Sequence, residues 1–404
     1  MNYPSRFAEL DHLLVKNRSW WQFRPFHQRA MPWCDSHPDL VAALLALGDD
    51  ELSALDSSSQ ALAAWLKPWL PDGGRLLELS RLPDAPLRAL DIPARLDVSV
   101  PGRKWQQACR FVAARPASSK PLLEWCSGKG HLGRLLASVD SCKVTSLEWQ
   151  QTLCDAGEAL SDKRGLSQRF VCGDAFDPSA SDWLPEHGQA VALHACGDLH
   201  VTLMRHWAGS AAENLTVSPC CYHLIKEDSY HPMSRQAKAS ALLLDRADLS
   251  LPLQETVTAG QGERRRREQD LLWRLSFDEW QRQVRGVDQY LPVPTLPRRY
   301  LSGSFADFCR AVAEHHQFVW PEVGDESVWL EKGRQRLKLV QRMELVAHLF
   351  RRPLEVWLVL DRVLFLEESG ARVSLQTFCD HSLTPRNILI HAERVFSAGP
   401  KAGH

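Results

Sequence analysis

Apolar residues spaced three and four apart dominate the first hundred residues, as in Leu40, Ala43, Leu44 and Leu47. This spacing has the period of an amphipathic helix, and no strand-like alternation interrupts it. We therefore expect residues 1–100 to form a helical N-terminal region.

From Lys120 the pattern changes to short apolar runs that alternate with amphipathic stretches. Such alternation is typical of a parallel sheet covered by helices on both faces. It predicts an α/β fold with a Rossmann-like, doubly wound sheet over residues 101–223. The expected strands are 121–125, 143–148, 168–172, 190–195 and 214–218, and the expected helices are 132–139, 150–160 and 199–207.

The later part of the chain is mostly helical in pattern from Pro232 to about Glu367. We interpret residues 224–367 as a helical insertion that could form a substrate region. Two further apolar runs, 373–378 and 387–393, are separated by a turn that contains Pro385. They predict that residues 368–404 supply the final strands of the sheet and a tail.

Bulk composition indicates a globular protein of the reducing, cytoplasmic compartment. The 404 residues carry a formal net charge of -1, contain no stretch of eighteen apolar residues, and begin without a signal-like apolar segment. The eleven cysteines are an odd number without small-scaffold spacing, which favours free thiols. We expect no membrane association, and any binding to a polyanion would depend on local basic patches.

A glycine-rich loop is the strongest local motif. Gly128, Gly130 and Gly133 have GxGxxG spacing directly after an expected strand and at the start of an expected helix. Glycines allow a sharp turn and a close approach of the backbone to a ligand, and Ser127 lies beside them. The loop alone leaves a nicotinamide dinucleotide and S-adenosylmethionine open as cofactors.

Charge distinguishes the two cofactors. Glu124, four residues before the first glycine, would repel a pyrophosphate placed on the loop and the helix N-terminus. S-adenosylmethionine has no phosphate and carries an ammonium and a sulfonium group, so a carboxylate at this strand end suits it. The position of Glu124 therefore favours S-adenosyl-L-methionine as the cofactor.

Two more acidic residues follow the next two strands. Glu148 lies 24 positions beyond Glu124, about the spacing of an acidic residue that binds ribose hydroxyls, and Trp149 could lie against the adenine. Asp174 and its neighbour Ala175 end the third strand, where a carboxylate can accept a hydrogen bond from the adenine amino group. Three acidic residues at three successive strand ends predict one cofactor site.

Further motifs extend this pattern along the chain: Leu193–Leu199 contains Cys-Gly-Asp-Leu, Ser218–His223 contains Cys-Cys-Tyr-His, and Leu383–Asn387 reads Leu-Thr-Pro-Arg-Asn. With the loop Cys126–Gly133 they make the chain resemble the class I methyltransferases, and more narrowly a methyltransferase-like group with these motifs. The resemblance spans roughly residues 101–395 and implies an S-adenosylmethionine-dependent methyltransferase. The cysteine and histidine motifs are more distantly similar to the eukaryotic tRNA acceptor-stem 2′-O-methyltransferase.

The ends of the fourth and fifth strands should border the transferred methyl group, since ligands of such sheets lie beyond the carboxyl ends of the strands. His194, Asp198 and His223 are the available bases, and Tyr222 could stack on a substrate or orient it. A metal site built from the nearby cysteines and histidines is an alternative, but no C-x-x-C spacing is present, and we expect no metal.

Other functions stay open at this point. A nicotinamide-dependent oxidoreductase could use the same loop, and a non-catalytic descendant of the fold could bind RNA or a protein. For a methyltransferase, structured RNA (tRNA or rRNA) is the favoured acceptor because of basic runs such as Arg264–Arg267. A protein acceptor is the main alternative.

Overall fold

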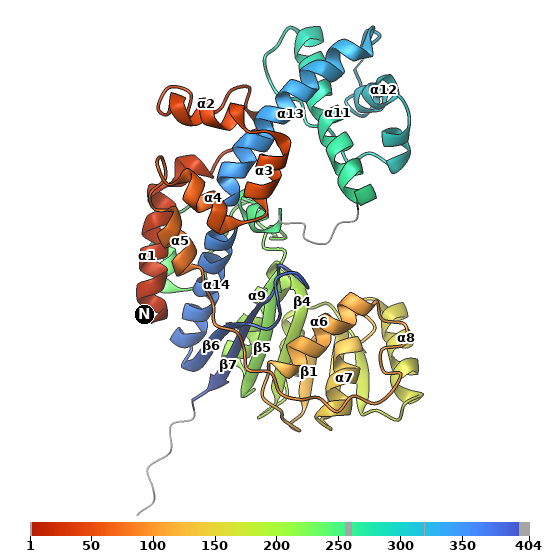
Figure 1. Cartoon of the computed structure of the whole chain (residues 1–404). Coiled ribbons are helices and arrows are strands. Elements are labelled where there is room, and N and C mark those ends of the chain that lie inside the picture. The colour runs from red at the N-terminus through yellow and green to blue at the C-terminus, as the bar shows by residue number, and fades with distance from the viewer. Residues whose placement is uncertain (1, 255–260, 319, 396–404) are drawn as a thin grey trace, which may run out of the picture. The chain divides into compact units, whose positions relative to one another are not determined.

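The computed structural model describes residues 2–254, 261–318 and 320–395 (Figure 1). The chain divides into two compact units, each made of separate parts of the sequence. The first unit comprises Met1–Lys16, Glu78–Thr258 and Arg351–His404, and the second comprises Asn17–Leu77 and Ala259–Phe350.

A seven-stranded sheet with the order β3-β2-β1-β4-β5-β7-β6 forms the centre of the first unit. Strands β1 to β5 run parallel, and β7 runs antiparallel to both β5 and β6. The strand order reverses between β1 and β4, which is where ligands bind in sheets of this kind. The strands are β1 (Leu122–Trp125), β2 (Val144–Glu148), β3 (Gln168–Cys172), β4 (Gln189–Cys196), β5 (Asn214–Cys220), β6 (Ala371–Thr377) and β7 (Ile388–Arg394).

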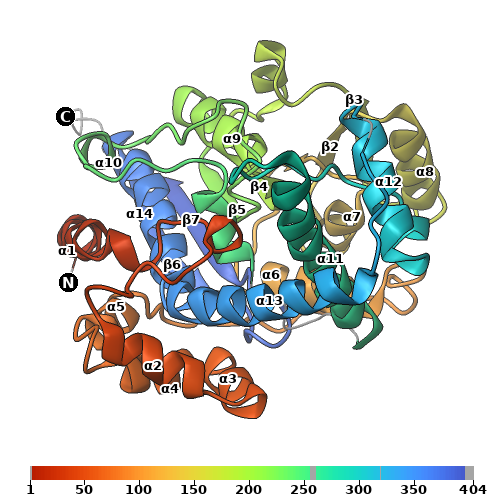
Figure 2. The same ribbon diagram turned by 90° about the horizontal axis from the view of Figure 1, so that it is seen from above.

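Helices cover both faces of this sheet (Figures 1 and 2). Helix α6 (Gly102–Ala113) packs beside α7 (His131–Val139) on one face, and α8 (Gln151–Asp162) packs on β3. Helix α9 (Asp198–Gly209) contacts β4, β5 and α14 (Arg351–Glu368). The central strands are apolar on both sides because both sides are covered. The predicted α/β fold and its seven strands are confirmed, with end positions that differ by one or two residues.

The segment after β5 is less helical than expected. Before α11 (Gln261–Arg285), the described residues form only the short α10 (Arg235–Lys238) and a 3₁₀ helix, η4 (Asp248–Leu253). The backbone N–H groups of Met233 and Ser234 donate to the carboxylate of Asp361 rather than to helical carbonyls. Partners distant in the sequence thus replace the local hydrogen bonds that a helix would need.

Helices α1 and α14 were expected outside the sheet-forming part of the chain, but both belong to the first unit. Helix α1 (Tyr3–Lys16) packs on α14, where Trp357 Nε1 donates to Asp11 Oδ1 at 2.8 Å and the rings of Phe7 and Trp357 lie 5.3 Å apart. The boundaries predicted at residues 100, 223 and 367 therefore do not coincide with those of the compact units. An apolar helix face indicates that the helix is covered, but not by which partner.

The second unit is helical. Helix α13 (Glu326–His348) packs along α11, and Gly333 allows the close approach, since a Cβ there would lie 2.0 Å from Ser276 Oγ. Aromatic residues of α11 and α12 form a core that includes Trp273, Phe277 and Phe308. The remaining helices are α2 (Pro38–Ala46), α3 (Asp49–Asp56), α4 (Ser59–Leu66), α5 (Gly73–Leu79) and α12 (Phe305–His315).

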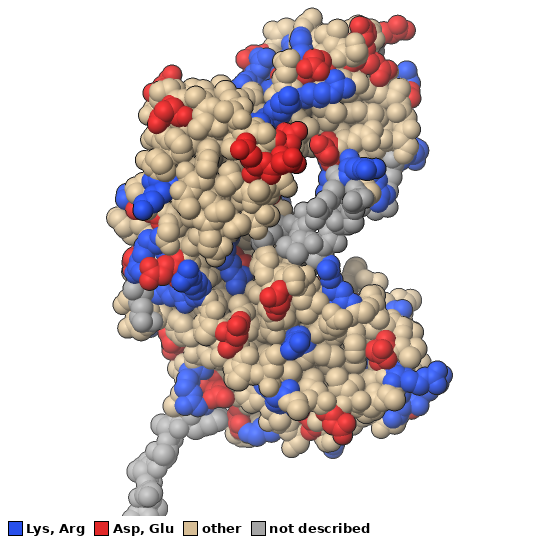
Figure 3. Space-filling view, viewed as in Figure 1, with Lys and Arg blue, Asp and Glu red and all other residues tan. Residues whose placement is uncertain are grey.

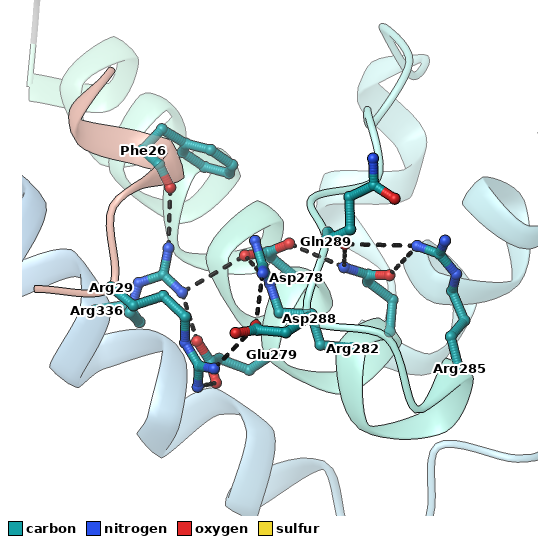
Figure 4. Close-up of polar contacts among 10 residues, drawn as sticks. Phe26, Arg29, Asp278, Glu279, Arg282, Arg285, Asp288, Gln289 and Arg336 are labelled. Atoms are coloured by element: carbon teal, nitrogen blue, oxygen red, sulfur yellow. Dashed lines mark hydrogen bonds and ion pairs between the residues drawn. The ribbon is translucent and has the colours of Figure 1, made fainter. Parts of the chain in front are cut away.

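Buried charges between α11 and α13 are paired within the second unit (Figure 4). Asp278 is fully buried and forms ion pairs with Arg282 at 3.0 Å and with Arg336 at 3.5 Å. Arg336 also pairs with Glu279 and donates to the main-chain oxygen of Phe26. Each buried charge here therefore has an opposite charge beside it, as the low-dielectric interior requires.

Two expectations from composition can be compared with the structure. All eleven cysteines lie in the described ranges, and none forms a disulfide. Helices α13 and α14, with 23 and 18 residues, carry charged side chains along their length. In the part of the chain that the structure describes, no helix combines the length and the apolarity needed to cross a membrane.

Candidate active site

The glycine loop joins β1 to α7 at the point where the strand order reverses. Gly128 and Gly130 have φ values of +59° and +62°, in the left-handed region that favours glycine. At Gly130 a Cβ would also lie 2.4 Å from the Phe170 ring, and at Gly133 it would lie 2.4 Å from Glu124 Oε2. The glycines thus permit a tight turn and the close packing of α7 on the sheet.

Glu124 is buried below this loop. Its Oε2 accepts a hydrogen bond from Ser146 Oγ at 2.6 Å, and the N–H of Gly133 donates to the carboxylate as well. Burial outweighs these hydrogen bonds and raises the pKa of Glu124 to about 7. The described residues form no ion pair with it. A cationic ligand nearby would therefore favour its ionised form.

Glu148 lies at the end of β2 and contacts the glycine loop. Its Oε2 accepts a hydrogen bond from the Gly128 N–H at 2.9 Å, and its Oε1 accepts one from the Gln150 N–H at 3.1 Å. The side chain holds the loop in place while its carboxylate lies at the edge of the sheet where a ligand would bind. Its contact with a ribose stays a prediction.

Two exposed aromatic side chains follow β2 and β3. Trp149 is 71% exposed and Phe176 is 53% exposed, so both have ring faces available for stacking. Asp174 is exposed and accepts a hydrogen bond from the Phe176 N–H at 2.9 Å, whereas Ala175 is buried. Phe176 was missed in the sequence, although its place two residues after Asp174 was an available signal.

A pocket of about 170 Å³ opens between α6 and the glycine loop. It brings together Glu124, Ser127, Gly128 and His194, four residues expected from the sequence. Ser127 Oγ is buried and has no hydrogen-bond partner among the described residues. The other residues predicted to bind the cofactor lie near the carboxyl ends of the parallel strands, the carboxyl edge of the sheet, and do not line this pocket.

The pocket also contains two residues that were not assigned a role from the sequence. Lys104 enters from α6, and His131, part of the glycine-loop motif, from the first turn of α7. Burial, together with the charges of Arg134, Lys104 and Lys129, lowers the pKa of His131 to about 4, so its ring is neutral near neutral pH. Lys104 could not be predicted from the sequence, because its helix precedes the first strand and lies in a segment without a motif.

His194 interrupts β4 beside the pocket. Its φ is +68°, and the register of β4 against β5 shifts between Leu193 and Cys196. Its Nε2 lies 2.9 Å from Gln107 Oε1, and Gln107 Nε2 donates to the Leu383 carbonyl at 3.3 Å. Because an amide oxygen only accepts, Nε2 carries the proton and Nδ1 is left as an acceptor. Burial lowers the pKa of His194 and keeps the ring neutral.

Asp198 and Tyr222 both have structural contacts, and a catalytic role for Asp198 stays a prediction. Asp198 Oδ2 accepts a hydrogen bond from the Lys226 N–H at 2.7 Å and so holds the loop after β5. Tyr222 is 1% exposed, its hydroxyl donates to Glu355 at 3.4 Å, and the Arg362 guanidinium lies over its ring. The expectation that Tyr222 stacks on a substrate is wrong, because the ring has no exposed face.

Three thiols gather where β4 and β5 end. Cys196 and Cys220 are paired positions of the two strands, with their Sγ atoms 3.6 Å apart, and the Cys221 Sγ lies within 4.8 Å of both. Hydrogen bonds from these two thiols lower the pKa of Cys221. His223 follows closely, and its Nδ1 is buried without a partner among the described residues. The sequence placed these residues at neighbouring strand ends but did not predict so dense a cluster.

Residues 104–228 match the model of a family described as a methyltransferase domain. Over this segment the chain is similar to methyltransferase domains. The match begins in α6 and ends after β5, so it contains the glycine loop, all three acidic residues and the thiol cluster. The methyltransferase resemblance and the fold class expected from the motifs are confirmed.

The match to a curated relative covers only part of this chain and part of the relative. A "Glutathione S-transferase C-terminal domain-containing protein" from Bos taurus is 31% identical over 131 residues, which are 31% of this chain and 20% of that protein. The chain thus spans about a fifth of the length of this curated relative.

Similar solved structures also cover only part of this chain. TrmN from Thermus thermophilus has 18% identity and a TM-score of 0.25, with 30% of this chain and 41% of that chain covered. A methyltransferase from Geobacter sulfurreducens, described in complex with S-adenosyl-L-homocysteine, has 15% identity and a TM-score of 0.23, with 32% and 56% covered.

Proposed function

We propose that this protein is an S-adenosylmethionine-dependent methyltransferase whose acceptor is structured RNA. The observation that carries the proposal is the composition of the carboxyl edge of the sheet. Two carboxylates, Glu124 and Glu148, flank a glycine loop, and the exposed Lys104 lines the pocket beside it, with the exposed Arg103 and Lys129 next to lining residues in the sequence.

The residues at this edge fit the methyl donor. Glu148 is placed to accept hydrogen bonds from ribose hydroxyls, Trp149 and Phe176 to enclose the adenine, and Asp174 to accept from its amino group. Glu124 suits the cationic end, since its buried carboxyl group forms no ion pair with the described residues and its pKa stays raised despite the charges of Arg134 and Lys104. The bound cofactor would supply a methyl group on a sulfonium. A nucleophile can take up this methyl group while the neutral thioether leaves.

The same carboxylates disfavour a nicotinamide dinucleotide. A pyrophosphate on this loop would lie near both Glu124 and Glu148, and the desolvated repulsion between like charges would weaken its binding. The N–H of Gly128, which a phosphate would need, already donates to Glu148. The arrangement therefore supports the methyltransferase over the oxidoreductase.

His194 is the residue best placed to assist the acceptor. It lines the pocket, it is neutral, and its proton-bearing Nε2 is held by Gln107, which leaves Nδ1 to accept a proton from an attacking hydroxyl or nitrogen. We assign it the role of general base. His223 lies by the thiol cluster, outside the residues that line the pocket.

Local charge at the pocket supports an RNA acceptor. Arg103 and Lys104 are exposed at the start of α6, and Lys129 is exposed within the glycine loop. Elsewhere on the face of the first unit in Figure 3, basic and acidic side chains are interspersed, in keeping with the net charge of -1. Phosphate contacts at these positions would place a base or ribose at the pocket.

The arginine run of the second unit contributes less to the proposal. Arg265, Arg266 and Arg267 are exposed on α11, and the side chain of Arg264 lies outside the described residues. An exposed basic run is equally typical of a solvated helix face. A phosphate contact by Arg264–Arg267 therefore stays a prediction from the sequence.

Transfer of labelled methyl groups tests the acceptor. Purified protein and labelled S-adenosylmethionine are added to total RNA and to total protein from cells that lack this gene product. We expect label in RNA. Label in protein alone would overturn the RNA acceptor and leave the methyltransferase intact, whereas failure to bind the cofactor would overturn both.

Salt dependence tests the basic pocket rim. Replacing Arg103 and Lys129 with Ser should reduce RNA binding and lower the slope of log affinity against log salt by about 0.7 to 0.9 per lost phosphate contact. The matched control replaces Lys143 and Lys163, two exposed residues that precede β2 and β3 at the opposite edge of the sheet. An equal loss in both variants would show that only total charge matters.

A further inference from the structure

The three thiols of Cys196, Cys220 and Cys221 point to one side of the sheet. Cys196 and Cys220 are register partners on parallel strands, so their side chains project from the same face. The next residue of a regular strand would project from the opposite face. Cys221 instead has a φ of +50°, which ends the strand and lets its Sγ remain within 4.8 Å of the other two.

The distances in this cluster suit a tetrahedral thiolate site. Zinc binds cysteine sulfur at about 2.3 Å, which places two sulfurs of a tetrahedral site about 3.8 Å apart. The Sγ atoms of Cys196 and Cys220 lie 3.6 Å apart, and all three lie within 4.8 Å of one another. We propose that Cys196, Cys220 and Cys221 bind Zn²⁺, with His223 as the fourth ligand.

Backbone strain supports a built site. His194 and Cys221 have φ values of +68° and +50° although neither is glycine, and β4 shifts register between Leu193 and Cys196. Left-handed conformations of such residues persist where the surroundings stabilise them, and they concentrate at functional sites. The positive φ of Cys221 keeps its thiol beside the other two, where one ion could contact all three.

His223 is our candidate for the fourth position. It lies two residues beyond Cys221, and its Nδ1 is buried with no hydrogen-bond partner among the described residues. Its ring is not part of the group of ligand atoms within 4.8 Å of one another, so it would turn toward the ion on binding. A buried polar atom without a partner is costly, and a metal bond would satisfy it. A cysteine and histidine set of this kind is one that zinc prefers.

The pairing of β4 with β5 explains why the spacing of these cysteines along the sequence did not indicate a metal site. The usual C-x-x-C spacing brings two ligands together within one turn, but here the register of β4 and β5 joins residues that are 24 positions apart. A disulfide would use only two of the three thiols and would leave Cys221 and His223 unexplained. The cluster therefore favours an ion over a redox pair.

The proposed zinc would fix one wall of the methyltransferase pocket. Cys196 follows His194 by two residues, and His194 lines the pocket. An ion that joins the ends of β4 and β5 would hold the irregular backbone at His194. This inference does not depend on which acceptor is methylated.

Metal analysis of the full-length reduced protein tests the proposal. Purified protein, kept in a phosphine reductant, should contain one Zn²⁺ per chain, and exchange for Co²⁺ should give the thiolate-to-cobalt charge-transfer absorption. The Ser variants of Cys196, Cys220 and Cys221 and His223→Ala should each bind Zn²⁺ at least about 100-fold more weakly, since even changes beyond the ligands cost 10- to 100-fold. Cys172→Ser, an exposed cysteine at the end of β3, is the control.

Each result of these measurements either supports or overturns the zinc site. Loss of the cobalt absorption in the Ser variants but not in the control, with far-UV circular dichroism unchanged, supports the site. Absence of the absorption in folded, reduced wild-type protein overturns it. So does mass spectrometry that finds Cys196 and Cys220 joined as a disulfide in protein purified under native conditions. An unchanged affinity in His223→Ala overturns the assignment of the fourth ligand.

Discussion

Buried acidic residues occur in both units, and their partners differ. In the second unit, Asp278 and Glu279 are neutralised by the arginines of the network in Figure 4. In the first unit, Glu124 forms no ion pair with the described residues, and burial outweighs its hydrogen bonds and the charges of Arg134 and Lys104, so that its pKa rises to about 7. A buried acid in direct contact with a cation serves stability, whereas one without an ion pair suits a charged ligand. The comparison separates structural from functional charge.

The largest expected effect comes from breaking the structural network. Arg336→Met should destabilise the protein by about 3–5 kcal/mol, because Asp278 and Glu279 would lose a buried partner. Denaturant unfolding measures this loss. Arg334→Met, on the exposed face of the same helix, should change stability by less than about 1 kcal/mol. Similar effects in both variants would contradict the distinction drawn above.

A smaller effect is expected at the carboxyl edge. Glu148→Ala should weaken S-adenosylmethionine binding by about 1.5–3 kcal/mol, the scale for losing hydrogen bonds to a charged group. Calorimetry measures the affinity, and circular dichroism checks that the variant is folded. Glu158→Ala, an exposed acid on the neighbouring α8, should bind normally. Normal binding by Glu148→Ala would remove Glu148 from the site.

The pH dependence of binding sharpens the role of Glu124. A cationic ligand prefers the ionised carboxylate, so affinity should rise with pH up to the pKa of about 7 and then level off. The rise can reach about tenfold per pH unit, or about 1.4 kcal/mol. Calorimetry between pH 5.5 and pH 8 should show this rise in the wild type and a flatter profile in Glu124→Gln. Parallel profiles would exclude Glu124 as the responsible group.

The smallest effect is expected from the exposed aromatic residues. Trp149→Ala should weaken cofactor binding by about 1 kcal/mol, the lower end of the range for stacking of a base on an aromatic ring. Trp183→Ala is a suitable control, because Trp183 is partly exposed and lies near the opposite edge of the sheet. Calorimetry should show a loss in the first variant alone.

The sequence predicted those features that depend on neighbouring residues. Strand periodicity located all seven strands, and the glycine spacing located the loop, because both signals extend over a few adjacent positions. Three acidic residues at successive strand ends were expected together, since the ends of parallel strands share one edge. The structure places them at that edge.

Features that depend on distant partners were not predicted. The pairing of α1 with α14 and the burial of Tyr222 against Glu355 join residues that are far apart in the sequence. Gln107, which orients His194, belongs to a helix that carries no motif. The sequence pattern shows whether a side chain is polar or apolar. Only the packing of the folded chain shows what that side chain contacts.

Cofactor discrimination tests the central claim most directly. Calorimetry on the purified full-length protein, with S-adenosylmethionine, S-adenosylhomocysteine and NAD titrated separately at neutral pH, gives one result for each ligand. The two sulfur-containing nucleosides should bind, and NAD should not, because Glu124 and Glu148 flank the loop where a pyrophosphate would lie. Tight binding of NAD without binding of either nucleoside would contradict the assignment of this chain as a methyltransferase.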